Sequence, residues 1–584
     1  MFSKKVVLTI ITAILILGGC GNSNSGGFAV SQISGTVATG EAASATVTIV
    51  GSNGETVVTN ADSQGNYSAD TTYLFSPMMI KAVLDRDGST LYSFTATPNK
   101  NVNVTPLTSY IVNHAAVALE TSGGASYMFN QFQSANSPSN IDENVQNSIT
   151  TLNNYISTTM SANDVDGFDH FSDEFSANHE GYDALLDALD IDIYEDDVII
   201  RINSNILNTL NYNIDVNEIN ASGIIYDITT DNPIANANIT ATDRMGNSVS
   251  TTTDINGSFT LAVETVRVYD FTITATGYED QLVPNIPSFV FTETSVGDVP
   301  MLPTGASGTT ALSGRIIDAR TADTGISDAT LIIRSGFGER LATPVATTST
   351  DSNGTFSINL PYGFYTVEMQ HDLYYKVFKN INIYGGSTEY DFSMLADLTA
   401  INASTNFFAT ITLNWDADPS DLDSHLTGPD SVSGRYHLNF ANRTIRSSNY
   451  YSSNDACSLG ILASLDRDRT SSTNGLLPET TTICKVESGG MYKYYVHHYS
   501  GTGTMSQGNA EVIVNTKNGT ARTFTAPSTN SVGYHDIWHV FNMDSYGNIY
   551  PVNEMIGNDV YDSTIFASSS RSSEIGIFEN LPSK

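Results

Sequence analysis

The chain has 584 residues, 40% of them hydrophobic, and a formal net charge of -37 at pH 7. This length and apolar content allow several folded domains and exclude a chain that is disordered throughout. The negative charge repels nucleic acid and anionic lipid, and we attribute most of the acidic residues to solubility outside the cell.

The first twenty residues predict export. Lys4 and Lys5 precede an apolar run at residues 6–17, which is too short to span a bilayer as a helix. Leu17-Gly18-Gly19-Cys20 follows, and the whole segment resembles the signal segment and lipobox of bacterial lipoproteins. An ordinary secretion signal with a coincidental cysteine is the alternative.

The lipoprotein resemblance implies a signal peptide at residues 1–19 and a mature chain that begins at the lipid-bearing Cys20. Acyl chains on this residue would anchor the protein to a membrane. Gly21 stands where the resemblance places Asp for inner-membrane retention, so it implies the outer membrane, at its periplasmic face or on the cell surface. We expect residues 20–30 to form a tether.

A turn pattern recurs three times along the chain. Each copy combines Asp, Gly and an aromatic residue in a hairpin signal, in which Asp binds the turn backbone and Gly supplies a positive φ. The copies are Asp62 to Tyr67, Asp254 to Phe259 and Asp351 to Phe356. Calcium binding by these Asp residues is the alternative to the turn interpretation.

The alternating strands around these turns resemble the carboxypeptidase regulatory-like domain, a small transthyretin-like β-sandwich. We place three such domains at residues 31–104, 218–303 and 311–396, with a linker at 304–310. The resemblance implies structural modules without catalytic residues.

Residues 105–217 interrupt this series with helical patterning. Thr105 and Pro106 are typical of a helix start, and apolar residues then recur at helical spacing. We therefore predict a helical insert. His170, Asp173 and Glu174 indicate either a solvated loop or a metal site within it.

The terminal part, residues 397–556, carries four motifs in a fixed order. They are Trp415 to Leu426, Leu465 to Asp468, Pro478 to Thr480 and Tyr494 to Ser500. In this order they resemble the YfaP-like family of exported bacterial proteins, and we expect a fourth β-sandwich. Residues 557–584 form a polar tail.

Cys457 and Cys484 lie in this terminal part. With Cys20 used for lipid, two cysteines remain in an exported chain, and they predict one disulfide. Closing that loop would stabilise the domain by roughly 3 kcal/mol. Metal binding by the cysteine pair is the alternative.

Acidic residues at every second position indicate a candidate cation-binding site in the terminal part. On a strand, Asp421, Asp423 and His425 share one face, opposite Leu422 and Leu426. If their strands are neighbours, Asp466 and Asp468 extend this patch, and Glu479 adds an oxygen. Such oxygen ligands suit Ca²⁺. Salt bridges through Arg467, Arg469 or His425, or simply a solvated strand face, are the alternatives.

We therefore predict a mainly β, multi-domain, lipid-anchored envelope or cell-surface protein without catalysis. Its sandwiches would act as spacers that present the terminal domain far from the anchor as a recognition module. One alternative is Ca²⁺-dependent binding of a glycan or peptide, with contacts from exposed aromatic residues such as Tyr450, Tyr451, Tyr492, Tyr494 and Tyr495. A role in the core is the more common explanation for alternate tyrosines of a strand. The other alternative is an envelope hydrolase, although the chain contains no H-E-x-x-H, G-x-S-x-G or P-loop motif.

Overall fold

The structure is a computed structural model. It describes residues 31–98, 100–119, 124–194, 196–202, 205–209, 218–288, 293–319, 324–386, 388–394, 396, 408–415, 419–429, 435–446, 461–470, 478–486, 490–508, 510–516, 521–527, 537–547 and 549–555. The predicted signal segment, Cys20, Cys457 and the polar tail lie outside these residues. Within the described ranges, no helix is both long and apolar enough to cross a membrane.

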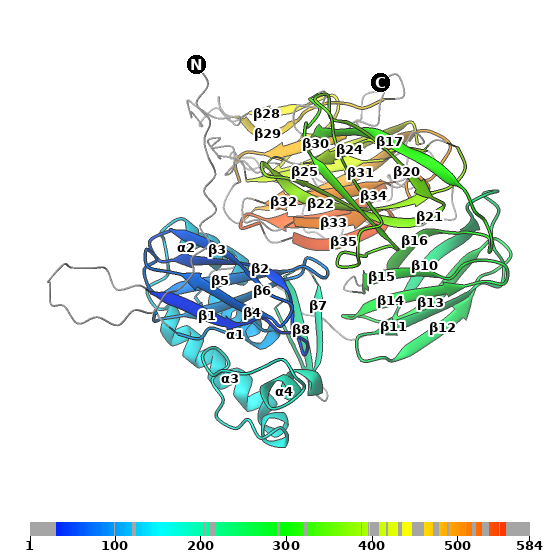
Figure 1. The fold of residues 1–584 in the computed structure, drawn as a ribbon. Coiled ribbons are helices and arrows are strands. Elements are labelled where there is room, and N and C mark those ends of the chain that lie inside the picture. Colours follow the sequence, from blue (N-terminus) through cyan, green and yellow to red (C-terminus); the bar gives the residue numbers. More distant parts are fainter. Residues whose placement is uncertain are drawn as a thin grey trace, which may run out of the picture.

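The fold is mainly β and is built from several β-sandwiches, as predicted (Figure 1). In the first sandwich a two-stranded sheet lies against a four-stranded one. The strands, in sheet order, are β1 (Gln32–Thr36) and β4 (Asn66–Asp70), then β3 (Thr56–Ala61), β2 (Ala45–Gly51), β5 (Met78–Leu84) and β6 (Thr90–Thr95).

The turn interpretation of the repeated Asp residues is confirmed. Asp62 Oδ1 accepts the backbone N–H groups of Gln64 and Asn66 at 2.8 and 2.9 Å. Asp254 and Asp351 make the same pair of bonds in their own turns. The glycine is required here, because Gly65 has φ +76° and an added Cβ would lie 2.2 Å from the Val37 carbonyl oxygen.

Among the described residues, four helices follow the first sandwich, and their apolar faces pack into the same hydrophobic core. They are α1 (Pro106–Ala118), α2 (Gly124–Gln133), α3 (Ile141–Ala162) and α4 (Tyr182–Ala188). The predicted start at Thr105 is confirmed, since its side chain accepts the N–H of Thr108 in a capping box. The helical segment is therefore part of one body with the first sandwich.

Two features of this segment differ from the prediction. A three-stranded sheet, β7 (Asp190–Tyr194), β8 (Asp197–Ile202) and β9 (Asn205–Asn208), follows the helices. His170 is fully buried, with Nδ1 2.9 Å from the Tyr182 hydroxyl and Nε2 2.7 Å from Asn153 Oδ1. The solvated-loop interpretation is wrong for this residue. We call residues 31–209 the first unit.

The second sandwich is formed by two sheets of three and four strands. They are β13 (Ser258–Glu264), β10 (Glu218–Asp227) and β16 (Glu293–Met301), facing β12 (Ser248–Thr252), β11 (Asn238–Asp243), β14 (Val268–Thr274) and β15 (Gln281–Pro287).

The third sandwich has the same plan. Its strands are β20 (Thr355–Pro361), β17 (Thr309–Asp318), β23 (Thr388–Glu389) and β24 (Phe392–Met394), facing β19 (Ala346–Ser349), β18 (Thr330–Ser335), β21 (Gly363–His371) and β22 (Tyr374–Ile383). In both sandwiches the last strands run parallel to the first long one, β10 or β17.

The terminal module, described between residues 408 and 555, is a larger sandwich around one core. Its first sheet is β28 (Thr444–Arg446), β29 (Ile461–Leu465), β30 (Glu479–Ile483), β25 (Ala409–Asn414), β32 (Glu511–Thr516) and β33 (Ala521–Thr525). Its second sheet is β27 (Arg435–Leu438), β26 (Asp421–Pro429), β31 (Met491–Ser500), β34 (Ile537–Asp544) and β35 (Ile549–Met555).

The chain folds back on itself, so the described units do not form the linear series of spacers that was expected. Arg522 Nη2 of the terminal module lies 2.9 Å from Asp196 Oδ1 and 2.7 Å from Asp197 Oδ2 of the first unit. The rings of Tyr127, on α2, and Tyr546 meet edge to face with centroids 5.5 Å apart. Figure 1 shows the first unit beside the yellow-to-red terminal module.

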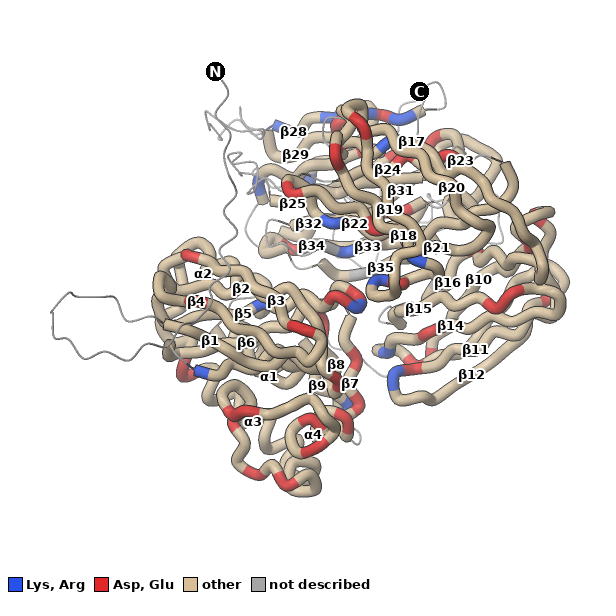
Figure 2. The backbone as a smooth tube through the Cα atoms, in the orientation of Figure 1, with Lys and Arg blue, Asp and Glu red and all other residues tan. Residues whose placement is uncertain are grey.

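The other units are joined by similar polar contacts. Arg267 of the second sandwich pairs with Asp190 of the first unit at 2.8 Å. The Thr480 hydroxyl of the terminal module donates to the Ala319 carbonyl of the third sandwich at 2.6 Å. Acidic residues are spread over all the described units in Figure 2, in keeping with a role in solubility.

Candidate metal centre in the terminal module

The candidate residues of β26 lie in the second sheet, between the edge strand β27 and the central strand β31. Leu422 and Leu426 belong to the sandwich core, so the alternation predicted along this strand is confirmed. The opposite face is nevertheless buried, because Asp421, Asp423 and His425 are only 5%, 0% and 0% exposed. The solvated-face interpretation is therefore wrong.

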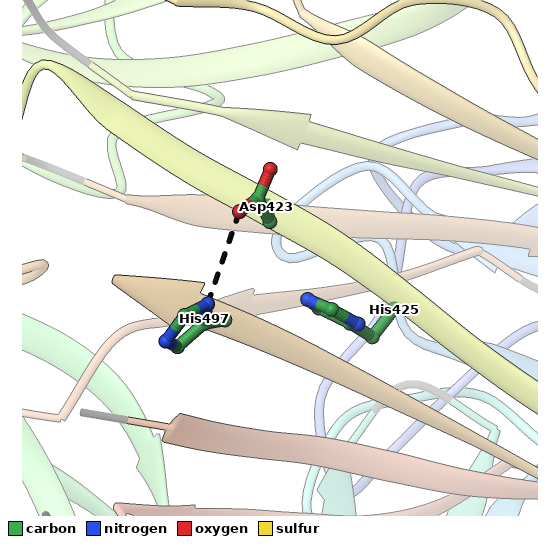
Figure 3. A group of neighbouring side chains, drawn as sticks. All are labelled: Asp423, His425 and His497. Carbon is green, nitrogen blue, oxygen red and sulfur yellow. Dashed lines mark ion pairs between the residues drawn. The ribbon is translucent and has the colours of Figure 1, made fainter. Parts of the chain in front are cut away.

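His497 completes a group with Asp423 and His425. It lies on β31 directly opposite Asp423, and residues paired in this way place their side chains on the same face. His497 Nδ1 is 3.8 Å from Asp423 Oδ2, and one ligand-type atom from each of the three residues lies within 4.8 Å of the others. Figure 3 shows the three side chains converging. We call these residues the Asp423 group.

Asp423 also belongs to a carboxylate group with Asp421 and Asp468. One oxygen from each lies within 4.8 Å of the others. Asp468 follows β29, a strand of the other sheet, so the predicted patch on two neighbouring strands is wrong in its geometry. Of the five predicted calcium ligands, the structure nevertheless brings together Asp421, Asp423 and Asp468.

Asp466 has a separate, local role. Its Oδ2 pairs with Arg467 Nε at 3.1 Å, and its Oδ1 accepts the N–H of Thr480 at 2.7 Å. Burial raises the pKa of this carboxyl. The salt-bridge alternative is thus confirmed for Asp466 and Arg467.

Glu479 ties together two segments that carry the site. It is fully buried, with Oε2 accepting the Ser424 N–H at 2.9 Å and Oε1 accepting the Arg469 N–H at 3.0 Å. Burial, with the nearby charge of Asp423, raises its pKa to about 8. The two carboxyl oxygens of Glu479 therefore link the backbone of β26, at Ser424, to the backbone of the segment after β29, at Arg469.

His437 is a further residue near the centre, which the sequence analysis did not include. It lies on β27, and its Nε2 is 2.8 Å from His425 Nδ1. Burial lowers its pKa to about 4, so the ring is neutral at pH 7. Alternation along residues 435–438 indicates a strand. It does not indicate that this strand, β27, pairs with β26.

The remaining predictions for this module have mixed outcomes. Tyr492 and Tyr494 belong to the sandwich core, so the core interpretation is confirmed for them. Tyr495 is only 2% exposed, and the alternative role as exposed ligand contacts is wrong for all three. Tyr450 and Tyr451 lie outside the described residues. Cys484 is buried, but Cys457 is also outside them, and the disulfide stays a prediction.

Comparison with protein families finds a known domain in one of the sandwiches. Residues 221–296 match the carboxypeptidase regulatory-like domain. This stretch covers most of the second sandwich, from β10 to the start of β16. The carboxypeptidase regulatory-like domain thus accounts for one unit of the chain. No curated protein matches the sequence.

Solved structures offer only distant likenesses. The Bacillus anthracis TIE protein is 10% identical, with 63% of this chain and 51% of that chain covered and a TM-score of 0.17, so this chain spans about half its length. The shaft pilin SpaA of Lactobacillus rhamnosus GG is 12% identical over 31% of this chain and 98% of that chain, with a TM-score of 0.12. A putative carbohydrate binding protein from Bacteroides uniformis is 14% identical over 37% and 96%, with a TM-score of 0.12. Likenesses this low carry no conclusion about function.

Proposed function

We propose that this chain is a non-catalytic, lipid-anchored envelope protein in which three β-sandwiches carry a C-terminal recognition module. The lipobox Leu17-Gly18-Gly19-Cys20, preceded by a charged and then an apolar segment, is the observation that carries the proposal. The units that follow are mainly β, and one of them matches the carboxypeptidase regulatory-like domain. The outer membrane is the proposed location.

The folded-back arrangement changes how such a protein would present its terminal module. Cys20 lies eleven residues before Ser31, where the described part of the chain begins. Eleven residues reach at most about 40 Å, so a lipid at Cys20 keeps the first unit near the membrane. Because Arg522 contacts Asp196 and Asp197 of that unit, the recognition module is held beside the unit that follows the anchor.

Metabolic labelling with a palmitate analogue tests the anchor. We expect the analogue to label the full chain and the protein to fractionate with membranes, because the lipobox presents Cys20 for acylation. Cys20→Ser should abolish the label, whereas the matched variant Cys484→Ser should keep it. An unlabelled parent protein, or a label that survives Cys20→Ser, contradicts the proposal.

A second candidate is calcium-dependent recognition of a glycan or peptide. It is favoured by the carboxylate group Asp421, Asp423 and Asp468, because calcium takes oxygen ligands. Both tryptophans of the chain, Trp415 and Trp538, lie in the terminal module, so their fluorescence reports its unfolding alone. For this candidate, calcium should raise the unfolding midpoint and a chelator should lower it.

A further inference from the structure

The Asp423 group has the ligand chemistry of a different kind of ion. It offers two imidazoles and one carboxylate, all from residues at most 4% exposed. Imidazole suits zinc and similar transition metals, whereas calcium and magnesium prefer oxygen alone. The two nitrogen donors therefore distinguish this group from the all-oxygen group that shares Asp423.

The spacing of the group is suited to one small ion. Ligand atoms about 2.1 Å from a tetrahedral zinc ion lie about 3.4 Å from one another. His497 Nδ1 and Asp423 Oδ2 are 3.8 Å apart, and all three ligand-type atoms lie within 4.8 Å. Small side-chain movements would close this gap. A direct charge-assisted hydrogen bond would be shorter, about 2.7–2.9 Å.

Burial gives the ion an energetic role. Asp423 is fully buried beside Glu479, and its charge is one cause of the raised pKa of Glu479. A buried carboxylate is costly unless an opposite charge compensates it. A divalent cation in contact with Asp423 would favour the charged form of this carboxyl, and metal binding uses the neutral form of the two imidazoles.

We infer that Asp423, His425 and His497 form a buried binding site for a divalent transition-metal ion of the zinc type. This site goes beyond the proposed anchoring and recognition, and it does not depend on calcium binding. The chain would supply three ligands, as in metal sites that keep an exchangeable fourth position.

His437 acts as a positioning residue for this site. Metal-binding histidines usually donate their second ring N–H to a fixed acceptor. His425 Nδ1 can donate to His437 Nε2 at 2.8 Å, while Figure 3 shows the outer ring nitrogen of His425 pointing toward the other two residues. Asn439 Nδ2 lies 3.3 Å from His437 Nδ1 and can donate to it. Without metal this contact favours a proton on His437 Nε2, which then donates to His425 Nδ1. Metal binding would therefore shift the tautomers of both rings.

Equilibrium dialysis of the full chain in detergent, stripped with a chelator and then titrated with zinc, tests the site. His179, Asp183 and Asp187 form another group within 4.8 Å, so the experiment uses a His179→Ala background to weaken it. We expect one zinc per chain and a raised unfolding midpoint by tryptophan fluorescence. His425→Gln and His497→Gln should each weaken zinc binding at least 100-fold, and His437→Phe about 10–100-fold.

His539→Gln is the matched control. His539 is on the neighbouring strand β34, where it stacks on Tyr495 with centroids 4.3 Å apart and lies outside the Asp423 group. Zinc affinity should be unchanged in this variant. Unchanged affinity in folded His425→Gln and His497→Gln, or binding of calcium but not zinc, overturns the site.

A measurement on the parent site does not depend on whether the variants fold. Cobalt replaces zinc in such sites, and X-ray absorption of the cobalt-loaded His179→Ala protein reports its ligands. Two imidazole nitrogens are expected in the first coordination shell. An all-oxygen shell, or no cobalt bound, overturns the inference without bearing on the lipid anchor.

Discussion

Replacing Arg522 by Met is expected to weaken the contact between the terminal module and the first unit by about 3–5 kcal/mol. The Arg522 side chain is 6% exposed and pairs with both Asp196 and Asp197. Burial already raises the pKa of Asp197 to about 6 in spite of the arginine. Without Arg522, the buried carboxylate loses its compensating charge, and separation of the two units returns it to water.

Hydrogen exchange followed by mass spectrometry measures this effect. In Arg522→Met, amides of β8 and β33 should exchange faster, because these strands carry the paired residues. Arg446→Met is the control, since Arg446 is exposed on β28. In a double-mutant cycle, Asp197→Asn should cost much less in the Arg522→Met background than alone. Equal exchange in Arg522→Met and the parent protein contradicts the interface.

The second large effect concerns pH. In protein stripped of metal with a chelator, the free energy of unfolding of the terminal module should fall by about 1.4 kcal/mol per pH unit between pH 6.5 and about 8. The folded module keeps a proton on Glu479 up to its pKa of about 8, whereas the unfolded chain, with a pKa of 4.5, has already released it. Raising the pH in this window therefore stabilises the unfolded state.

The lower limit of the window comes from His437. Its pKa is about 4 when folded and 6.5 when unfolded, so between these values the unfolded chain holds the extra proton. Stability then rises with pH, which offsets the effect of Glu479 up to pH 6.5. Above pH 6.5 His437 no longer offsets the decline in stability that Glu479 causes. The decline ends at about pH 8, where folded Glu479 releases its proton.

Denaturant unfolding followed by the fluorescence of Trp415 and Trp538 measures this slope. Glu479→Gln should remove the decline, at a cost of about 1–3 kcal/mol, because one backbone N–H then faces an amide group instead of an acceptor. Glu554→Gln, at an exposed position on β35, should keep the parent slope. If the decline persists unchanged in Glu479→Gln, another group causes it and the prediction is contradicted.

Local features of the fold could be predicted from the sequence because their causes are local. The turn at Asp62 uses only residues within the next four positions, and the Thr105 cap uses Thr108. The strands β7 to β9 were not predicted, although Asp192 and Arg201 alternate with apolar neighbours, because these short strands directly follow a segment with helical spacing.

The site could be predicted only in part, for a physical reason. Alternation placed Asp421, Asp423 and His425 on one face of a strand, and in the structure ligand-type atoms of Asp421 and His425 each lie within 4.8 Å of an Asp423 oxygen. That this face is buried, and that His437 and His497 lie beside it, depends on which strands pair. The pairing of β26 with β31 joins segments far apart in the chain, and no local pattern encodes it, whereas β27 follows β26 directly as its hairpin partner.

The arrangement of the units also depends on contacts between distant segments. Asp197 and Arg522 are paired across 325 positions of the chain. Module order alone suggested a linear stalk, with the anchor and the terminal module at opposite ends. The structure instead places the terminal module against the unit that follows the anchor.

Photo-crosslinking in membranes of expressing cells tests most directly whether the anchored protein holds its terminal module beside the first unit. A benzoylphenylalanine at position 546 replaces Tyr546, whose ring lies 5.5 Å from that of Tyr127. We expect an intramolecular crosslink to the peptide that contains α2 (Gly124–Gln133). Folded, lipid-labelled protein that gives no crosslink to residues 124–133 would contradict the folded-back arrangement.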